Sequence, residues 1–400
     1  MSEVIVVGGG AAGMMAAIAA ADCGHQVTII EKNEKLGKKL FITGKGRCNI
    51  TNDSDVENHL NHVISNPKFM YSAFYSFDSS RMIDFLEQEG LAVKTERGNR
   101  VFPQSDKSSD VLQTLQKALR RRNVTVRLHT KMTGLMIEDH ICKGVKVQSY
   151  HGALETLTAD DVILTTGGLA YPSTGSTGDG HRLLKQAGVA LEPCYPALVP
   201  VETVEEWPIR LQGLSLRNVS LRVERGSHKI YEEQGEMLFT HFGVSGPLVL
   251  SASSLLGRKG AKDCKLHIDL KPALSEEQLD ERLQRDFAAQ KNSMFKNSLG
   301  KLLPSKLIPV IVELSEITPD KQVNEVTRQE RHRLVKLCKD LTCTVKKLRD
   351  FPEAIVTGGG ISVKAINPAT MELKEISHLF AAGELIDVDG ACGGYNLQWA

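Results

Sequence analysis

Residues 4–31 read VIVVGGGAAGMMAAIAAADCGHQVTIIE, and this stretch decides the fold. The apolar, largely β-branched run 4–7 predicts a short strand that is buried on both faces. The Ala- and Met-rich run 11–21 predicts a helix, because these residues have high helix propensity. A second β-branched run at 27–30 predicts another strand. The stretch therefore predicts a complete βαβ unit, the building block of a doubly wound α/β domain.

Three glycines join the first strand to the helix with the spacing Gly8-x-Gly10-x-x-Gly13. The spacing is informative because it follows a strand and opens a helix, where free N–H groups can bind a pyrophosphate. Glu31 closes the second strand 18 residues after Gly13, where a carboxylate can accept a hydrogen bond from a ribose hydroxyl. The residues expected to contact a dinucleotide here are Gly8, Gly10, Ala11, Ala12, Gly13, Glu31 and Lys32.

The composition is that of an ordinary globular protein. The 400 residues are 41% hydrophobic and 24% charged, and 49 Lys and Arg against 48 Asp and Glu give a net charge of +1. This balance argues against non-specific nucleic-acid binding, which requires a basic surface. No run reaches the ~18 apolar residues of a membrane span, and the eight cysteines form no CxxC pair and no zinc-ligand spacing. We therefore expect a cytoplasmic protein that acts on a small molecule and has no metal site.

The residue pattern changes twice along the chain. Mixed strands and helices give way to short alternating runs over 197–256, which predict antiparallel β-structure. A helical pattern follows over 275–345, and the remainder returns to strands and glycine loops. The expected parts are a discontinuous α/β domain at 1–192 and 350–400, a β-rich insert at 193–272 and a helical insert at 273–349.

The identity of the dinucleotide follows from both ends of the chain. An acid at the end of the second strand favours a ribose diol over a 2′-phosphate, so the dinucleotide is NAD or FAD rather than NADP. Residues 379–384, LFAAGE, resemble the second FAD fingerprint of glutathione-reductase-type flavoproteins, in which a strand ends in Gly-Asp and the acid holds the ribityl chain. Here Gly383 is followed by Glu384 instead of Asp. Residues 393–398, GGYNLQ, predict a loop that enters a helix. The resemblance to such flavoproteins implies that this helix N-terminus faces the flavin, with Asn396 and Leu397 beside it.

Longer strings extend this resemblance over nearly the whole chain. They are LGKKL at 36–40, GKGRCNITN at 44–52, STGSTGDG at 173–180, LFTHFGVSGP at 238–247 and VTGGG at 356–360. With these strings the chain resembles a family of bacterial FAD flavoproteins that includes an aminoacetone oxidase and a bile-acid enone reductase. The resemblance implies a Rossmann-type, glutathione-reductase-like FAD-binding domain with inserted β-barrel and small helical subdomains.

The same resemblance assigns further residues and an activity. The residues that it places along FAD are Lys39, Arg47, Cys48 and Asn49 at the pyrophosphate and flavin, Met132 near the adenine, and Gly168 in the loop over the dinucleotide. It implies an FAD-dependent oxidoreductase. We expect reduction of a C=C bond conjugated to a ketone, as in a bile-acid-like enone. The alternative within the family is an oxidase of a small amine such as aminoacetone that produces hydrogen peroxide.

Other features of the sequence leave alternatives open. A second strand–GxGxxG–helix unit is missing, so NADH or NADPH would have to dock transiently near the flavin. His241 is equally compatible with a proton carrier and with a core residue, and Tyr171 with a substrate pocket and with packing. Cys48 has no second cysteine within 20 residues, so this stretch alone predicts no redox dithiol, although Cys392 could approach it. A flavoprotein that acts on RNA is a third reading, and it predicts a basic face.

The end of the sequence carries one further expectation. The helix expected after Gly394 has about six residues before Ala400, which is too few to cover a sheet. We therefore expect that the natural chain continues past this residue.

Overall fold

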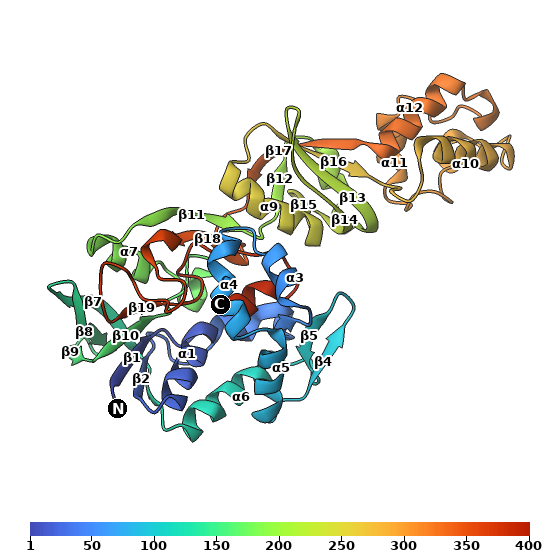
Figure 1. Cartoon of the computed structure of the whole chain (residues 1–400). Helices are drawn as coiled ribbons and strands as arrows, with labels where there is room; N and C mark the ends of the chain where they lie inside the picture. The colour runs from blue at the N-terminus through green and yellow to red at the C-terminus, as the bar shows by residue number, and fades with distance from the viewer. The chain divides into compact units, whose positions relative to one another are not determined.

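The computed structural model describes residues 1–400, which form two compact units (Figure 1). The sheet unit combines residues 1–197 with 350–400, and the barrel unit comprises residues 198–349. The two ends of the chain therefore fold into the same unit, and the barrel unit is inserted between them. Each unit is described by itself.

A five-stranded parallel sheet forms the centre of the sheet unit, in the order β19-β10-β1-β2-β6. Its strands are β1 (Glu3–Val7), β2 (Gln26–Ile30), β6 (Thr125–Arg127), β10 (Asp161–Leu164) and β19 (Leu379–Ala381). The residues of the predicted strand 4–7 are all buried, as in a parallel sheet covered on both faces. The chain continues from β1 to β2 on one side, while β10 lies on the other. This reversal opens a crevice at the carboxyl ends of β1 and β10.

Helix α1 (Ala11–Asp22) joins β1 to β2, so the structure confirms the predicted βαβ unit. The helix itself carries small and apolar side chains on all of its sides, and its Met14 and Ala17 are fully buried. Such a helix must be covered on several sides. Helix α6 (Ser108–Arg121) packs beside it (Figure 1).

Three smaller sheets and several short helices complete the sheet unit. The sheets are β3-β5-β4, β7-β8-β9 and β11-β18. Their strands are β3 (Thr51–Asn52), β4 (Val93–Glu96), β5 (Arg100–Pro103), β7 (Thr130–Glu138), β8 (Ile141–Ser149), β9 (Leu154–Thr158), β11 (Leu191–Ala197) and β18 (Val356–Ile361). The remaining helices are α2 (Lys38–Ile42), α3 (Val56–Asn61), α4 (Tyr71–Ser76), α5 (Ser79–Gln88), α7 (Asp179–Gln186) and α13 (Tyr395–Trp399).

A closed six-stranded barrel forms one part of the barrel unit, in the order β12-β15-β14-β13-β16-β17. Its strands are β12 (Val201–Thr203), β13 (Ser215–Arg225), β14 (His228–Thr240), β15 (Gly243–Ser245), β16 (Cys264–Asp269) and β17 (Leu341–Leu348). Alternate residues point inward, and Leu221, Phe239 and Leu266 are fully buried. The ring of Trp207 meets that of Phe239 edge to face at 5.9 Å.

Helices make up the rest of the barrel unit. They are α8 (Trp207–Arg210), α9 (Pro247–Lys259), α10 (Glu276–Ala288), α11 (Ile308–Leu314) and α12 (Arg328–Lys339). Ser275 and Thr327 each form a capping box, which fixes the starts of α10 and α12. The buried residues of these helices join those of the barrel in one continuous core.

The sequence-based assignment was wrong at two places in this unit. The end of the stretch predicted as helical, 275–345, is strand β17, whose residues 341–345 alternate between buried and partly exposed. The end of the stretch predicted as β-structure, 197–256, is helix α9, which begins at Pro247. Proline suits the first turn of a helix, because its missing N–H group would have no partner there.

No helix in this structure combines the length and the apolar character that a bilayer crossing demands.

The barrel core yields a test of stability. Replacing Phe239 by Ala removes a fully buried ring, so we expect a loss of about 3–5 kcal/mol in unfolding free energy. Val204 is 60% exposed in the same unit, and Val204→Ala should change stability by less than ~0.5 kcal/mol. Urea denaturation followed by circular dichroism measures both. Equal effects of the two substitutions would contradict this description of the core.

Candidate functional site

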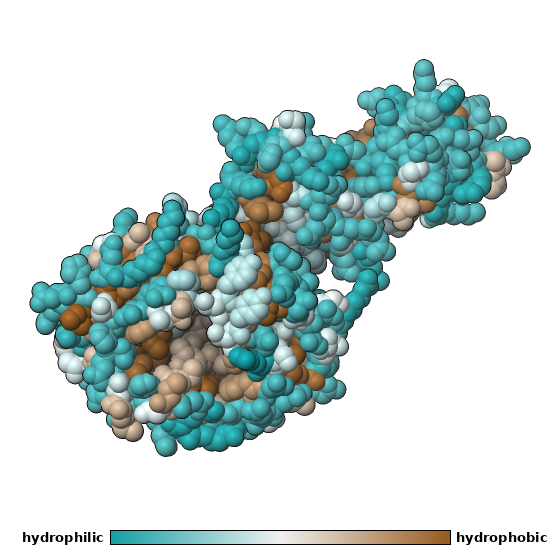
Figure 2. All heavy atoms as spheres, viewed as in Figure 1, coloured by the Kyte–Doolittle hydropathy of each residue, from teal (hydrophilic) through white to brown (hydrophobic).

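A cavity of about 1250 Å³ opens at the carboxyl ends of β1, β2 and β10. Residues from both ends of the chain line it, from Val7 to Thr43 and from Ile355 to Ala400, together with two middle segments, 130–132 and 165–179. Figure 2 shows a hollow in this unit, where brown and pale residues gather inside a teal rim. The cavity therefore lies where parallel α/β sheets bind their ligands.

The turn between β1 and α1 forms one wall of the cavity. A Cβ atom on Gly13 would lie 1.8 Å from the Gly8 carbonyl oxygen, so a side chain there would push the helix off the strand. Gly8 has a φ of +109°, and a Cβ on it would lie 2.5 Å from the Thr165 carbonyl oxygen. The Thr165 hydroxyl donates to the carbonyls of Val7 and Gly8, at 2.9 Å each. Both glycines are thus required by the packing of the protein itself.

Gly10 differs from these two glycines. A Cβ atom built on Gly10 meets no protein atom within 4 Å, and its φ of −79° suits any residue. Gly10 lines the cavity and precedes α1, which has no side-chain cap and no acidic residue in its first turn. The free N–H groups at this helix start therefore face open space that a ligand can occupy.

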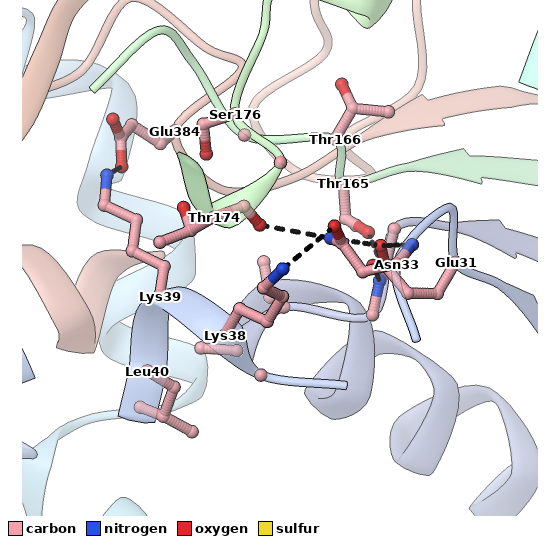
Figure 3. Close-up of a pocket in the computed structure, with 18 of the residues that line it drawn as sticks. Glu31, Asn33, Lys38, Lys39, Leu40, Thr165, Thr166, Thr174, Ser176 and Glu384 are labelled. Carbon is pink, nitrogen blue, oxygen red and sulfur yellow. Dashed lines mark hydrogen bonds and ion pairs between the residues drawn. The ribbon is translucent and has the colours of Figure 1, made fainter. Parts of the chain in front are cut away.

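Glu31 is held at the end of β2 by three N–H groups. Its Oε2 accepts from Gly9 N–H at 2.7 Å, and its Oε1 accepts from the backbone and side-chain N–H groups of Asn33 at 2.8 and 2.7 Å (Figure 3). A carboxylate has about four acceptor positions, so one remains for a ligand hydroxyl. This arrangement fits the contact with a ribose hydroxyl predicted for Glu31.

A loop covering 172–178 closes this end of the cavity. The Asn33 side chain donates to the Thr174 carbonyl at 3.1 Å, and Lys32 Nζ lies 2.8 Å from Asp179 Oδ2. Burial opposes ionisation of Asp179, but Lys32, Lys131 and Thr177 outweigh it and lower the pKa of Asp179 to about 2. The carboxylate is therefore ionised at any physiological pH and ties the loop to the end of β2.

The opposite end of the cavity is formed around Glu384. Its Oε1 accepts from Thr357 N–H at 2.8 Å, and its Oε2 lies 2.5 Å from Lys39 Nζ. Thr357 in turn accepts from Leu169 and Ala170 N–H groups through its hydroxyl, at 2.8 and 2.9 Å. These bonds connect the turn after β19 to strand β18 and to the segment after β10.

His181 supports the same turn from behind. Its Nε2 lies 3.0 Å from the Leu385 carbonyl, to which it donates, and its Nδ1 lies 4.0 Å from Cys194 Sγ. Burial lowers the pKa of His181, and burial raises the pKa of Cys194 to about 11. A neutral imidazole and a neutral thiol therefore position the backbone next to Glu384.

Most of the residues predicted to bind the cofactor line this cavity. They are Gly8, Gly10, Ala11, Ala12, Glu31, Lys32, Lys39, Met132, Glu384, Asn396 and Leu397. Gly13, Gly168 and Gly383 lie behind the wall and allow close packing. A Cβ on Gly168 would meet the Thr357 hydroxyl at 2.3 Å, and one on Gly383 would meet Ala12 Cβ at 2.7 Å.

Arg47, Cys48 and Asn49 are not among the lining residues. Arg47 forms ion pairs with Glu96 and Asp106, at 2.6 and 2.5 Å, and its guanidinium lies over the Phe102 ring. The Asn49 amide, oriented so that its hydrogen bonds are satisfied, accepts from Gly394 N–H at 2.9 Å. Arg47 therefore joins the segment after α2 to the segments that carry Glu96 and Asp106, and Asn49 joins it to the loop before α13.

Cys48 is a buried residue without redox character in this structure. Burial raises the pKa of its thiol to about 12, so the reactive thiolate is suppressed. Cys48 and Cys392 are not joined by a disulfide.

The two candidate catalytic residues lie in different units. Tyr171 begins the loop over the cavity, with a φ of +54°, and its N–H donates to the Phe351 carbonyl at 3.2 Å. His241 lies in the turn between β14 and β15 of the barrel unit, where it is exposed and contacts the Phe242 ring. Its exposure excludes the role of a core histidine.

Several lining residues were not found from the sequence. They are Asn33, Lys38, Thr43, Thr130, Lys131, Thr165, Thr166, Gly167, Thr174, Gly175, Ser176, Asp179, Ile355 and Val356. Asp179 had a readable signal, because an acid between two glycines opens a helix there. The threonines had none, since their roles depend on contacts between distant segments.

The cavity fits a dinucleotide with a ribose diol and a pyrophosphate. Gly10 leaves room beside the α1 N-terminus, and Glu31 keeps an acceptor position free. These features agree with the FAD expected from the sequence.

A second cavity of about 810 Å³ adjoins the first and is apolar. Its lining includes Met15, Met70, Phe74, Phe77 and Trp399, and it shares Ala11, Leu40, Leu397 and Ala400 with the first cavity.

Comparison with known proteins places this site in a family. A family model described as the HI0933-like protein Rossmann domain matches residues 2–400. The 3-dehydro-bile acid delta(4,6)-reductase of Clostridium scindens is 32% identical over 100% of this chain and 96% of its own length. The ribosomal RNA dihydrouridine synthase of Escherichia coli is 30% identical over 100% of this chain and 95% of its own length.

A solved structure agrees with the fold. The 3-ketosteroid delta1-dehydrogenase of Sterolibacterium denitrificans superposes with a TM-score of 0.52 at 15% identity, covering 99% of this chain and 98% of the other. This similarity shows a shared architecture alone.

The contrast between Gly10 and Gly13 yields a matched pair of variants. Gly10→Ala adds a methyl group in the cavity, so the dissociation constant of FAD should rise at least ~10-fold while unfolding free energy changes by less than ~1 kcal/mol. Gly13→Ala collides with Gly8, so it should destabilise the ligand-free protein by about 1–3 kcal/mol. FAD titration by flavin fluorescence and urea denaturation separate the two effects. Unchanged FAD affinity in Gly10→Ala would contradict the assignment of the cavity.

Buried histidines predict a dependence of stability on pH. Burial lowers the pKa of His181 and of His59 from 6.5, so below that pH the unfolded chain binds protons that the folded chain does not. Their contribution to stability is complete above pH 6.5 and decreases as the pH falls toward the lowered values. His181→Gln should reduce the slope of the unfolding free energy against pH, measured below pH 6.5, by at most ~1.4 kcal/mol per pH unit. Exposed His151→Gln is the control, and equal slopes in both variants would refute this role of His181.

Proposed function

Because the chain belongs to the HI0933-like family of Rossmann-domain proteins and is an FAD-dependent oxidoreductase, we propose that it reduces a C=C bond conjugated to a carbonyl group. The observation that carries this proposal is the likeness to two relatives, each at least 30% identical along the whole chain, combined with a cavity suited to FAD. The bile-acid-like enone is the preferred substrate, since its relative has the higher identity of the two.

The names of the two relatives describe one kind of chemical change. A 3-dehydro bile acid with delta(4,6) double bonds has C=C bonds conjugated to its 3-ketone. Dihydrouridine is uridine whose C5=C6 bond, conjugated to the C4 carbonyl, has been reduced. Each change adds a hydride and a proton across a C=C bond that is conjugated to a carbonyl group. This common step favours a reductase over the amine oxidase.

The residues of the cavity provide what such a reaction demands of the protein. The α1 N-terminus and Glu31 would hold the dinucleotide portion of FAD, while Glu384 and Lys39 lie at the other end. FAD, when bound, supplies the hydride chemistry. The protein positions the cofactor and excludes water around it. We further propose that NADH or NADPH docks transiently to reduce the flavin.

RNA is a second candidate substrate, and the charge of the barrel unit favours it. Residues 198–349 contain 25 Lys and Arg against 20 Asp and Glu, whereas the remainder contains 24 against 28. The exposed side of α12 carries Arg328, His332, Arg333 and Lys336. Basic residues on one helix face can bind phosphates of a nucleic acid. The near-zero net charge of the whole chain conceals this difference between the units.

A two-step anaerobic experiment tests the proposed reaction. Holoprotein is mixed with NADH or NADPH, and we expect the visible absorbance of the flavin to bleach with one of them. Photoreduced holoprotein is then mixed with a 3-oxo-4-ene bile acid. Reoxidation without oxygen and a product that has gained two hydrogen atoms, by mass spectrometry, are the expected results. Gly10→Ala protein prepared without FAD is the control.

The same experiment distinguishes the alternatives. Reoxidation by uridine-containing ribosomal RNA but not by the enone would transfer the proposal to RNA. In that case Arg328→Glu with Lys336→Glu should weaken salt-sensitive RNA binding at least ~10-fold, and Lys262→Glu, on the barrel, should not. Reoxidation by neither, with peroxide released from aminoacetone in air, would overturn the proposal in favour of the oxidase.

A further inference from the structure

Lys39 and Glu384 face one another at one end of the FAD cavity (Figure 3). Lys39 lies in α2, near the start of the chain, and Glu384 follows β19, near its end. The Lys39 Nζ atom lies 2.5 Å from Glu384 Oε2, and the two side chains are 26% and 14% exposed. The pair is therefore screened from water more than a surface ion pair.

Both partners are anchored to rigid parts of the sheet unit. Glu384 Oε1 accepts from Thr357 N–H at 2.8 Å, in strand β18. The helix that carries Lys39 is held against the turn between β1 and α1, because Gly37 N–H donates to the Gly9 carbonyl at 2.8 Å. A glutamate is one methylene longer than the aspartate of glutathione-reductase-type proteins. The Glu384 carboxylate is placed so that it reaches the strand and the ammonium group together.

The other cavity cations have different partners. Lys32 and Lys131 lie 2.8 and 3.7 Å from Asp179, at the end covered by the 172–178 loop. Lys38 lies 3.3 Å from Glu34. Within the cavity, Lys39 is thus the cation that meets Glu384, and the balance of charge at this end depends on these two residues.

We propose that Lys39 is a positioning residue for the cofactor that acts by neutralising Glu384. FAD carries two negative charges on its pyrophosphate, and an uncompensated carboxylate in the cavity would repel them. With Lys39 present, Glu384 can hold its position at Thr357 without that repulsion. The pair as a unit then sets the affinity for FAD and the charge next to the flavin. This proposal rests on the FAD site described above and is independent of the substrate.

Three variants test the proposal through the dissociation constant of FAD. Lys39→Met leaves a bare carboxylate, so the dissociation constant should rise at least ~10-fold. Glu384→Gln removes the carboxylate that Lys39 neutralises, so it should lose less FAD affinity than Lys39→Met does. The double variant should bind FAD better than Lys39→Met does. Lys39→Arg should restore affinity, and Lys35→Met, an exposed lysine outside the cavity, should have no effect.

The midpoint potential of the bound flavin is a second measurement that a purely structural role would not move. Reduction adds negative charge to the flavin, so the potential should fall in Lys39→Met and rise in Glu384→Gln. A double variant that binds FAD no better than Lys39→Met, together with unchanged potentials, would overturn the proposal. Wild-type protein that binds FAD but reduces no enone would instead contradict the proposed function and leave this inference standing.

Discussion

The close approach of α1 to β1 is the constraint on which the rest of the sheet unit depends. With a Cβ on Gly13 only 1.8 Å from the Gly8 carbonyl oxygen, the helix could not start where it does. Thr165 locks the same turn from the neighbouring strand β10 by donating to two carbonyls of β1 and its turn. The helix start is therefore placed at the carboxyl edge of the sheet, and the other walls of the cavity are arranged around it.

Charge inside the cavity is organised in two separate groups. At one end Asp179 compensates Lys32 and Lys131, and at the other Glu384 compensates Lys39. Glu31, between the sheet and the loop, is held by N–H groups instead of by a cation. A carboxylate bound in this way keeps its charge and an open acceptor position, as recognition of a neutral hydroxyl requires. The arrangement suits a ligand that is anionic in the middle and rich in hydroxyls on either side.

Features that depend on neighbouring residues could be predicted from the sequence. Features that depend on contacts between distant segments could not. The βαβ unit over 4–31 is readable because strand, turn and helix signals follow one another without interruption. Glu384 and Asn396 were readable by resemblance, and the structure brings them to the cavity that Gly10 lines. Thr165 was not readable, because its role depends on a strand more than 100 residues away in sequence. Strand β17 was missed because five alternating residues directly after α12 carry too little signal to end a helical pattern.

Because the site is built from both ends of the chain, its two parts are synthesised at different times. The cavity residues up to Thr43 and those from Ile355 onward are separated by roughly 310 residues. At a synthesis rate of ~5–20 residues per second, the two halves of the site are made roughly 15–60 s apart. The barrel unit, whose core consists of its own residues alone, can fold in that interval. Acquisition of the flavin is therefore a late event, and a nascent chain arrested before Ile355 would be colourless although most of its length were already made.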